Sequence, residues 1–487
     1  MATQSRATFA ALKVVGQNAM KASKDIMGLA SDSRAVKPGY LFAALAGSRD
    51  DGARFVADAV QRGATVVLGR PELAGQAKAL GVRFVAADNP RLALAHEAAS
   101  FFGAQPATVA AITGTNGKTS VSVFLRQIWQ ALGHRSASMG TVGLITPSGE
   151  ISLSQTTPDP IVLHDMLARL KREGIEHLAI EASSHGLDQY RLDGVKVAAA
   201  AFTNITRDHL DYHQTFDRYL ASKLRLFGEV VRIGGLAVVN AQAEHAACFV
   251  EAARKRDLKL LRVGAEGSEI ALLNSDPHGD GQNLLIRFGD REFSVALPLA
   301  GAFQAFNVLV AAGLAIGLGS APEDVFAALS SLKGAPGRME RVARTSSGGT
   351  IYVDYAHTPD ALETVLTAVR PHTKGKLVAV FGCGGDRDAG KRRMMGAVAA
   401  RLADRVIVTD DNPRSEDPAA IRLAILAACP GAKEVGSRSD AIRAGIEALG
   451  EGDVLVIAGK GHESGQIIGS VTRPFSDRAE AIKWSAA

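Results

Sequence analysis

The chain has 487 residues, which predicts about three domains at roughly 150 residues per domain. Its apolar share of 47% and charged share of 22% are typical of a globular protein, and they exclude intrinsic disorder, a collagen-like repeat and an acidic tail. The net charge of +5 suits any polyanion, nucleotides included, while 5% aromatic residues argue against base stacking on single strands.

Cysteine usage and hydropathy bear on the compartment. The three cysteines are scattered and form no Cys-x-x-Cys pair: Cys248, Cys383 and Cys429. This favours a reducing compartment, so we expect a cytoplasmic protein. The short apolar stretch 9–15 is interrupted by a lysine and predicts no signal peptide. The longest apolar run, 308–319, is too short and too rich in glycine for the roughly 20 residues of a membrane span.

The first hundred residues predict alternating short strands and helices. Strands are expected at 39–45, 65–68 and 83–87, the last two buried, and helices at 54–62 and 92–102. The Gly-Ala-Gln-Pro stretch at 103–106 then predicts a linker, which ends a first domain at residue 106.

A second α/β pattern begins with the β-branched run 108–113, which leads at once into a glycine-rich turn. Further strands are expected at 177–180, 197–202 and 236–239, and helices at 121–132, 216–227 and 303–318. Two apolar runs, 284–288 and 292–297, flank Gly289-Asp290, which predicts a hairpin in a small antiparallel excursion.

A Gly-Ala-Pro-Gly stretch at 334–337 marks a second boundary, so the expected domains are 1–106, 107–337 and 338–487. Four apolar strands follow, separated by helical segments, at 350–354, 376–381, 405–409 and 453–458. This alternation predicts a parallel sheet, and ligands of such sheets gather at the carboxyl ends of the strands. We therefore expect three α/β domains, the central one built like a P-loop ATPase and the C-terminal one Rossmann-like.

The motif Gly114-Thr-Asn-Gly-Lys-Thr119 lies between an expected strand and an expected helix. The backbone N–H groups of such a loop suit a polyphosphate. Lys118 is expected to reach the outer phosphates, and the Thr119 hydroxyl to hold Mg²⁺. Position 112 is isoleucine where the common pattern has glycine, so this is a shortened variant. An ordinary glycine-rich turn is the alternative.

This loop resembles the ATP loop of the Mur ligase family, which includes the folylpolyglutamate synthetases. Further motifs follow in that family's order over nearly the whole chain: Glu181-Ala-Ser-Ser-His-Gly, Thr203-Asn-Ile-Thr-Arg-Asp-His-Leu-Asp-Tyr-His213, Asn307, Arg338 and Asp354-Tyr-Ala-His357. The resemblance implies an ATP-dependent amide ligase. Such an enzyme phosphorylates a carboxylate, and an amine then attacks the acyl phosphate. Positioning and charge neutralisation govern a phosphoryl transfer of this kind.

The resemblance also implies roles for particular residues. ATP is expected at Gly114, Thr115, Asn116, Gly117, Lys118, Thr119 and Ser120, and its base and ribose at Asn307, Arg338 and Asp354. Mg²⁺ is expected at Thr119, Glu181, His209 and Lys223, and the catalytic residues are Lys118, Glu181, His209 and Lys223. Histidine suits Mg²⁺ less well than oxygen ligands, so a helix-start histidine that bonds its neighbours is the alternative for His209. The intervening residues of the His209–His213 pair lack the HExxH glutamate, and zinc is not expected.

Lys223 is informative without the family. Its spacing from Tyr219, Leu220 and Phe227 places it on the apolar face of the helix expected at 216–227. Burial lowers the pKa of a lysine, and its neutral amine can react with CO₂. The resemblance implies that Lys223 is carbamylated and helps to hold a second Mg²⁺. A snorkelling lysine is the alternative.

The resemblance implies UDP-N-acetylmuramoyl-L-alanyl-D-glutamate as the carboxylate substrate. Its uridine and diphosphate end is expected on the N-terminal domain, at Ser31, Ser33, Ser48, Arg49 and Asp50. Its muramoyl dipeptide end is expected at Gln155, Thr156, Thr157, Ser183, Gln189 and Arg191. Arg191 is a natural partner for a carboxylate or phosphate. The Ser and Thr residues could equally be ordinary turn and cap residues.

The run Asp411-Asn412-Pro413-Arg414 follows the strand expected at 405–409. Arginine offers a fork to a carboxylate, and Asp and Asn can hold an ammonium group. An Asn-Pro turn is the alternative. The run resembles that of the diaminopimelate-adding members of the family, so meso-diaminopimelate is the expected amine. The rest of the expected pocket is Arg387, Gly459 and Glu463.

Two alternative functions stay open. One is that of another ligase of the family, which adds lysine or D-alanyl-D-alanine. The other is that of a P-loop switch or motor, which is a different class of protein. A dinucleotide site at Gly382-Cys-Gly-Gly385 is not expected, because Arg387 replaces the third glycine of that fingerprint. The sequence has no stripe of Lys and Arg residues interleaved with aromatic residues, so nucleic-acid binding is not expected. We expect a monomer that holds ATP where the central and C-terminal domains meet and that closes on its substrates.

Overall fold

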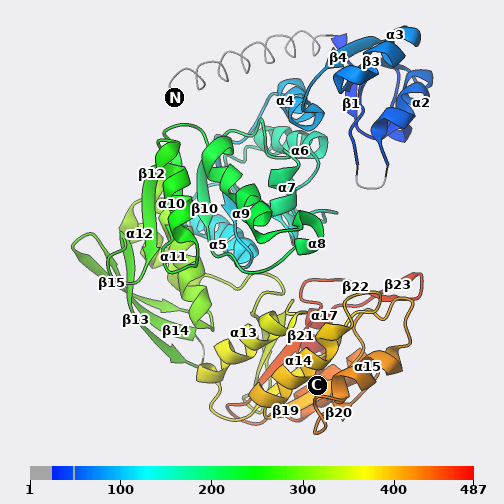
Figure 1. Ribbon diagram of the computed structural model, residues 1–487. Coiled ribbons are helices and arrows are strands. Elements are labelled where there is room, and N and C mark those ends of the chain that lie inside the picture. Colours follow the sequence, from blue (N-terminus) through cyan, green and yellow to red (C-terminus); the bar gives the residue numbers. More distant parts are fainter. Residues whose placement is uncertain (1–24, 48–49, 280, 487) are drawn as a thin grey trace. The chain divides into compact units, whose positions relative to one another are not determined.

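The computed structural model describes residues 25–47, 50–279 and 281–486, and these form an α/β protein (Figure 1). The chain folds into two compact units: residues 1–118, 133–239 and 243–260, and residues 119–132, 240–242 and 261–487. The expected fold class, with parallel sheets and helices between the strands, is confirmed. In the described part of the chain, no helix is long and apolar enough to cross a membrane. The apolar stretch 9–15 lies outside that part.

The first unit begins with a parallel sheet of order β1-β2-β3-β4. Its strands are β1 (Gly28–Ala30), β2 (Tyr40–Ala43), β3 (Ala64–Gly69) and β4 (Arg83–Ala86), and its helices are α2 (Val56–Gln61), α3 (Ala74–Ala79) and α4 (Pro90–Phe102). The expectation of a buried β4 is wrong, because Arg83 and Ala86 are exposed. Among the described residues β4 pairs with β3 alone, at the edge of the sheet, which explains its exposure.

The remaining strands of the first unit are β5 (Thr108–Thr113), β6 (Ser136–Gly140), β7 (Gly143–Thr146), β8 (Gly149–Ile151), β9 (His177–Glu181), β10 (Val197–Phe202) and β11 (Leu236–Asn240). Their order is β11-β10-β5-β9-β6-β7-β8, parallel except for β7 and β8. The helices are α6 (Pro160–Arg172), α7 (Ser184–Asp188), α8 (Leu210–His213), α9 (Phe216–Arg225) and α10 (Ala246–Lys255). A π-helical turn, Leu226–Val230, continues α9.

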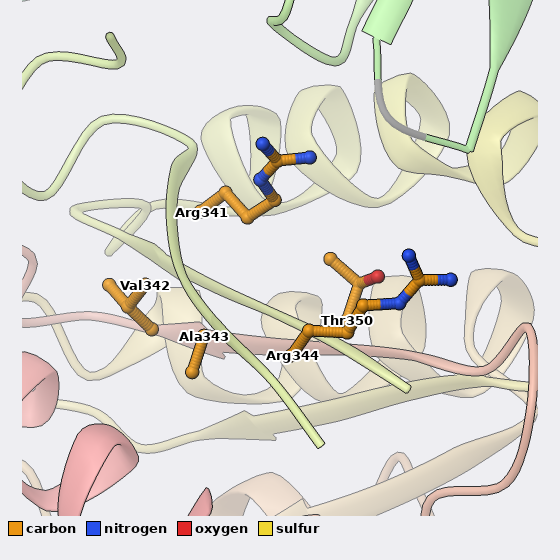
Figure 2. Close-up of a pocket in the computed structure, with 5 residues that line it drawn as sticks. All are labelled: Arg341, Val342, Ala343, Arg344 and Thr350. Atoms are coloured by element: carbon orange, nitrogen blue, oxygen red, sulfur yellow. The ribbon is translucent and has the colours of Figure 1, made fainter. Parts of the chain in front are cut away.

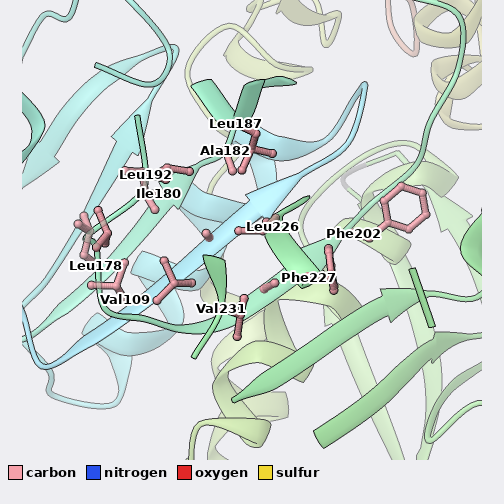
Figure 3. Packing of buried hydrophobic residues seen from close by; sticks show 14 of the residues in the cluster. Val109, Leu178, Ile180, Ala182, Leu187, Leu192, Phe202, Leu226, Phe227 and Val231 are labelled. Carbon is pink, nitrogen blue, oxygen red and sulfur yellow. The ribbon is translucent and has the colours of Figure 1, made fainter. Parts of the chain in front are cut away.

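One hydrophobic cluster packs around these strands. Val109 of β5 lies beside Leu178 and Ile180 of β9 (Figure 3), and the Phe202 and Phe249 rings stack with centroids 3.7 Å apart. Every residue of β10 is buried, as expected for a parallel strand covered on both faces. Burying each large apolar side chain contributes about 1.5–3 kcal/mol. The carboxyl ends of β5, β9 and β10 are therefore firmly placed.

The second unit contains α5 (Lys118–Ala131) from Thr119 onward, and β12 (Lys259–Gly264) from Leu261 onward. β12 pairs in parallel with β13 (Ile270–His278), which is followed by β14 (Gly281–Phe288) and β15 (Arg291–Leu297). The expected hairpin around Gly289 is confirmed, since β13, β14 and β15 pair as an antiparallel meander. Two helices, α11 (Ala302–Gly317) and α12 (Pro322–Ala328), come next.

The last sheet has the order β16-β17-β21-β18-β19-β20. Its strands are β16 (Glu340–Arg344), β17 (Thr350–Asp354), β18 (Leu377–Phe381), β19 (Arg405–Val408), β20 (Lys433–Glu434) and β21 (Val454–Ala458). All neighbours pair in parallel except β16, which confirms the predicted parallel sheet. The accompanying elements are α13 (Pro359–Val369), α14 (Gly390–Leu402), α15 (Pro418–Leu426), α16 (Arg438–Glu447), α17 (Asp477–Ser485) and the hairpin β22 (Gly465–Ile468)–β23 (Val471–Pro474).

Candidate active site

The glycine-rich loop between β5 and α5 is held by the segment that follows β10. The backbone N–H of Asn116 donates to Asn204 Oδ1 over 2.9 Å, and that of Thr115 donates to the Asn204 carbonyl over 2.8 Å. At Gly114, where φ is +150°, an added Cβ would lie 1.9 Å from Thr203 Oγ1, so only glycine fits. The loop is thus fixed in shape. Asn204 was not predicted to have a role of its own.

Two lysines converge on one carbonyl oxygen of this loop. Nζ of Lys118 donates to the Gly114 carbonyl over 3.0 Å, and Nζ of Lys223 donates to the same oxygen over 2.7 Å. Lys223 is only 1% exposed, which confirms its expected place on the apolar face of α9. Burial holds the pKa of Lys223 well below its usual range, and the nearby charge of Lys118 lowers that pKa further. Whether Lys223 is carbamylated stays a prediction.

Glu181, the last residue of β9, is completely buried. Thr141 binds both of its carboxylate oxygens: the backbone N–H donates to Oε1 over 2.8 Å, and the hydroxyl donates to Oε2 over 3.1 Å. An added Cβ on Gly140 would lie 2.1 Å from Glu181 Oε1. Glu181 is therefore an anchored carboxylate, and its described side-chain hydrogen bonds come from neutral donors. Thr141 was not predicted, because a short Gly-Thr-Val-Gly turn gives no periodic signal.

Three histidines lie close together on α7 and around α8. His209 precedes α8 with a left-handed φ of 53°, which confirms that it opens a helix. The His185 ring lies 5.0 Å from the His209 ring and 5.5 Å from the His213 ring, centroid to centroid. Burial lowers the pKa of all three, and the charges of His209 and His213 help to lower that of His185 to about 4. His185 is therefore neutral at pH 7, burial favours the neutral form of the other two rings as well, and neutral imidazole is the metal-binding form.

Arg191 brings together residues expected at the muramoyl dipeptide. Its Nη1 donates to Gln155 Oε1 over 2.6 Å and to the Thr157 carbonyl over 2.7 Å, and its Nη2 donates to Gln189 Oε1 over 2.7 Å. These side chains border a hollow of about 80 Å³ that is lined by Leu45, Arg91, Leu94, Gln155, Asp159, Pro160, Gln189 and Arg191. Arg91 was not predicted, because it lies just before the helix expected at 92–102 and belongs to none of the motifs.

The serines and threonines expected around the sugar have mixed roles. Thr157 Oγ1 donates to the Glu181 carbonyl over 2.8 Å, and Thr156 Oγ1 lies 3.1 Å from Thr141 Oγ1. Ser183 Oγ caps α7 by accepting from Gly186 N over 3.0 Å, as the cap alternative predicted. On the N-terminal sheet, Ser31 is exposed, Ser33 is buried, and Asp50 forms an exposed ion pair of 3.4 Å with Arg54. Ser48 and Arg49 lie outside the described residues.

Several residues of the expected ATP site lie in the second unit: Thr119 and Ser120 from the glycine-rich loop, and the residues expected at the base and ribose. Thr119 and Ser120 are buried in the first turn of α5, and Asn307 Nδ2 donates to Gln304 Oε1 over 3.0 Å. The Arg338 guanidinium lies 4.4 Å from the centre of the Tyr355 ring. Asp354 accepts from Met339 N and Ala356 N, both over 2.7 Å. Burial raises the pKa of Asp354, although the charge of Arg338 opposes this.

The residues expected around the amino acid meet at the carboxyl ends of β19 and β21. Arg414 Nη1 donates to the Gly385 carbonyl over 2.8 Å, and Asn412 Nδ2 donates to Glu463 Oε2 over 3.0 Å. An added Cβ on Gly459 would lie 2.5 Å from Asp411 Oδ2. One on Gly384 would lie 2.7 Å from Arg414 Nη1 and 3.8 Å from Arg387 Cγ, so the two arginines flank one glycine.

A cavity of about 340 Å³ lies along β16 and contains none of the predicted site residues (Figure 2). Its walls are Arg341, Val342, Ala343 and Arg344 of β16 and Thr350 of β17. Among the described residues, no group of three or more His, Cys, Asp or Glu side chains is arranged to hold a metal ion.

A glycine-rich phosphate loop, a buried carboxylate and a buried lysine beside parallel strand ends define a phosphate-loop α/β enzyme. Three family models match the chain: the "Mur ligase family, catalytic domain" over residues 25–102, the "Mur ligase middle domain" over 112–315 and the "Mur ligase, glutamate ligase domain" over 337–461. The chain belongs to the Mur ligase family, and the resemblance drawn from its motifs is confirmed.

Several similar proteins carry the name UDP-N-acetylmuramoyl-L-alanyl-D-glutamate–2,6-diaminopimelate ligase. The relative from Bradyrhizobium diazoefficiens is 56% identical over 465 residues, which cover 95% of each chain. The one from Caulobacter vibrioides is 53% identical over 469 residues, 94% of this chain and 95% of the relative. A solved structure with that name is 33% identical, covers 95% of both chains and has a TM-score of 0.72.

Proposed function

We propose that this protein is an ATP-dependent ligase that adds meso-diaminopimelate to the D-glutamate of UDP-N-acetylmuramoyl-L-alanyl-D-glutamate, a step in peptidoglycan precursor synthesis. The observation that carries the proposal is the 56% identity, over 95% of both chains, to a relative with that name. Asp411-Asn-Pro-Arg414 supports the same amine, because it supplies both a carboxylate-binding fork and an acid at one strand end.

ATP is proposed to bind at the loop Gly114–Thr119 and at Ser120, with its base and ribose at Asn307, Arg338 and Asp354. Mg²⁺ is proposed at Thr119, Glu181, His209 and Lys223. The donor set fits, because Glu181 is a buried carboxylate whose described hydrogen bonds come from neutral donors, and burial lowers the pKa of His209, which favours its metal-binding neutral form. When bound, Mg²⁺ supplies positive charge that stabilises the transferring phosphoryl group.

The chain's own residues then orient the reactants. Lys118 places its ammonium over the loop, within reach of the outer phosphates. The substrate carboxylate takes the γ-phosphoryl group of ATP and becomes an acyl phosphate, and ADP is the leaving group. The neutral amine then attacks the carbonyl carbon and loses a proton, and phosphate leaves from the tetrahedral intermediate to give the amide. Arg191, fixed by three hydrogen bonds, is proposed to hold an anionic group of the muramoyl dipeptide.

Each expected domain is proposed to receive one ligand. Residues 1–106 take the uridine diphosphate end of the sugar, 107–337 take ATP, and 338–487 take the amino acid. Arg387 and Arg414 bind the distal carboxylate of diaminopimelate, and Gly459 and Glu463 complete that pocket. We also propose that the protein acts as a monomer in the cytoplasm, which light scattering and cell fractionation would test.

A radiometric assay with ATP and the UDP-sugar tests the proposal by comparing labelled diaminopimelate, lysine and D-alanyl-D-alanine. We expect label to enter the sugar nucleotide only with diaminopimelate, together with release of phosphate. Incorporation of either other amine would reassign the chain within the family. Phosphate release that needs neither the UDP-sugar nor an amine would instead favour a nucleotide-hydrolysing switch.

A further inference from the structure

Lys460 directly follows Gly459 after β21, and it is fully buried. Its Nζ donates to Asn412 Oδ1 over 2.9 Å and to Glu463 Oε2 over 3.1 Å. Burying an ammonium group is costly unless that group is paired and hydrogen-bonded. Both of its partners belong to the proposed amino-acid pocket, so this buried charge joins two binding residues.

The bonds to Asn412 fix which way its amide points. Asn412 Oδ1 accepts from Lys460 Nζ over 2.9 Å and from the backbone N–H of Ile467 over 3.0 Å. Both groups can only donate, so the amide oxygen must face them, and Nδ2 is turned to Glu463 Oε2 at 3.0 Å. An amide oxygen has two lone pairs, and both are occupied. Asn412 therefore has no acceptor left for an ammonium group of the substrate.

Glu463 shows the complementary arrangement. Its Oε2 accepts from both Asn412 and Lys460, whereas its Oε1 has no hydrogen bond to any residue that the structure describes. The side chain is 34% exposed. Oε2 of Glu463 is thus fixed by two hydrogen-bond donors, and Oε1 is open to a ligand.

The hairpin β22–β23 holds the same loop from another side. Gln466 Nε2 donates to the Asp411 carbonyl over 2.7 Å, and Arg414 N donates to the Ile467 carbonyl over 3.1 Å. With the Ile467–Asn412 bond, these contacts fix the loop backbone. Lys460 is the only cation hydrogen-bonded to the side chains of Asn412 and Glu463 among the described residues.

We propose that Lys460 is a positioning residue for the amino-acid pocket. It locks the Asn412 amide and one oxygen of Glu463, and so leaves Glu463 Oε1 as the acceptor for the distal ammonium of the incoming amino acid. The substrate class rests on the proposed function. Asn412 acts through Glu463 rather than on the substrate's ammonium, which differs from what the motif alone predicts.

The first test is Lys460→Met, which keeps most of the side-chain volume and removes the charge. Losing a charged hydrogen bond corresponds to roughly a tenfold or larger effect, so the KM for diaminopimelate should rise at least about tenfold. The KM for ATP and for the UDP-sugar should stay within about threefold. Leu366→Val, in the buried core of the same sheet, is the matched control: it should lower Tm and leave all three KM values unchanged.

The second test, Asn412→Asp, stays informative even if Lys460→Met does not fold. The new carboxylate would face Glu463 Oε2 at the 3.0 Å now spanned by a hydrogen bond. Without the Nδ2 donor, Glu463 Oε2 keeps only its bond to Lys460, so the KM for diaminopimelate should rise about tenfold although the pocket gains a negative charge. A direct ammonium acceptor would instead be preserved or improved by this substitution.

The outcomes separate the two proposals. If the wild-type protein uses diaminopimelate but Lys460→Met or Asn412→Asp leaves its KM unchanged, the positioning role is overturned and the function stands. If the wild-type protein ligates no diaminopimelate, the proposed function fails first. A KM increase confined to the amino acid in both variants supports the inference.

Discussion

Glu97 is a buried carboxyl group, and the effect of its titration on stability can be measured. It lies on α4 and is 1% exposed, and neither carboxylate oxygen has a hydrogen-bond partner among the described residues. Its spacing from Ala93 and Leu94 places it on the face of α4 that packs into a hydrophobic cluster. Burial raises the pKa of Glu97 from 4.5 to about 7, although the charge of Arg83 opposes this.

The sign of the effect follows from proton binding. Between pH 4.5 and 7 the folded protein keeps a proton on Glu97 that the unfolded chain has lost. The free energy of unfolding therefore falls as pH rises through this window, and the loss is complete above the folded pKa. A difference of about 2.5 units corresponds to roughly 3.4 kcal/mol in total, of which about 1.4 kcal/mol falls between pH 6 and 8.

Glu97→Gln removes the titration and keeps the shape. We expect the free energy of unfolding of the variant, relative to wild type, to increase by about 1.4 kcal/mol from pH 6 to pH 8. Urea titrations at both pH values measure this difference, and Glu72→Gln, at an exposed position in the short helical turn Pro71–Leu73, is the control. If wild type and Glu97→Gln lose stability in parallel between pH 6 and 8, the buried neutral carboxyl is refuted.

Three further substitutions test the proposed site. Gly140→Ala would place a Cβ 2.1 Å from Glu181 Oε1, so we expect a higher Mg²⁺ requirement with an unchanged circular dichroism spectrum; an unshifted Mg²⁺ titration would contradict this. Lys223→Ala should lose activity that acetate or another short carboxylate partly restores, and full activity without rescue would end the carbamylation hypothesis. Arg414→Ala should raise the KM for diaminopimelate about 10- to 100-fold and spare that for ATP, whereas equal rises for both would indicate a folding defect.

Local sequence patterns correctly predicted a strand whose residues are all buried. The run Val197–Phe202 was expected and found with the same bounds, because a parallel strand buried on both faces is apolar throughout. Strand β4 was expected to be buried, yet edge or centre is decided by which strands pair, and local sequence does not encode that. Strand β6 was missed because Ser136–Gly140 is rich in small residues and has no clear period.

Some residues of the candidate site could likewise be predicted from local sequence, and others could not. Helical spacing alone placed Lys223 on a buried face, since that is a local property of α9. Thr141, Asn204 and Lys460 gave no comparable signal, because each has a hydrogen-bond partner 40 or more residues away in the chain. The local sequence does not show such a partner until the fold brings it near.

The Thr115 hydroxyl ties the glycine-rich loop to two other segments of the chain. Its hydroxyl accepts from Thr206 N over 3.0 Å and lies 2.8 Å from the Tyr219 hydroxyl, one helical turn before Lys223. The loop is thereby fastened both to the stretch that leads to His209 and to helix α9. One hydroxyl therefore links three segments that are far apart in the sequence. Any displacement of the loop would strain its bonds to the Thr206 segment and to α9.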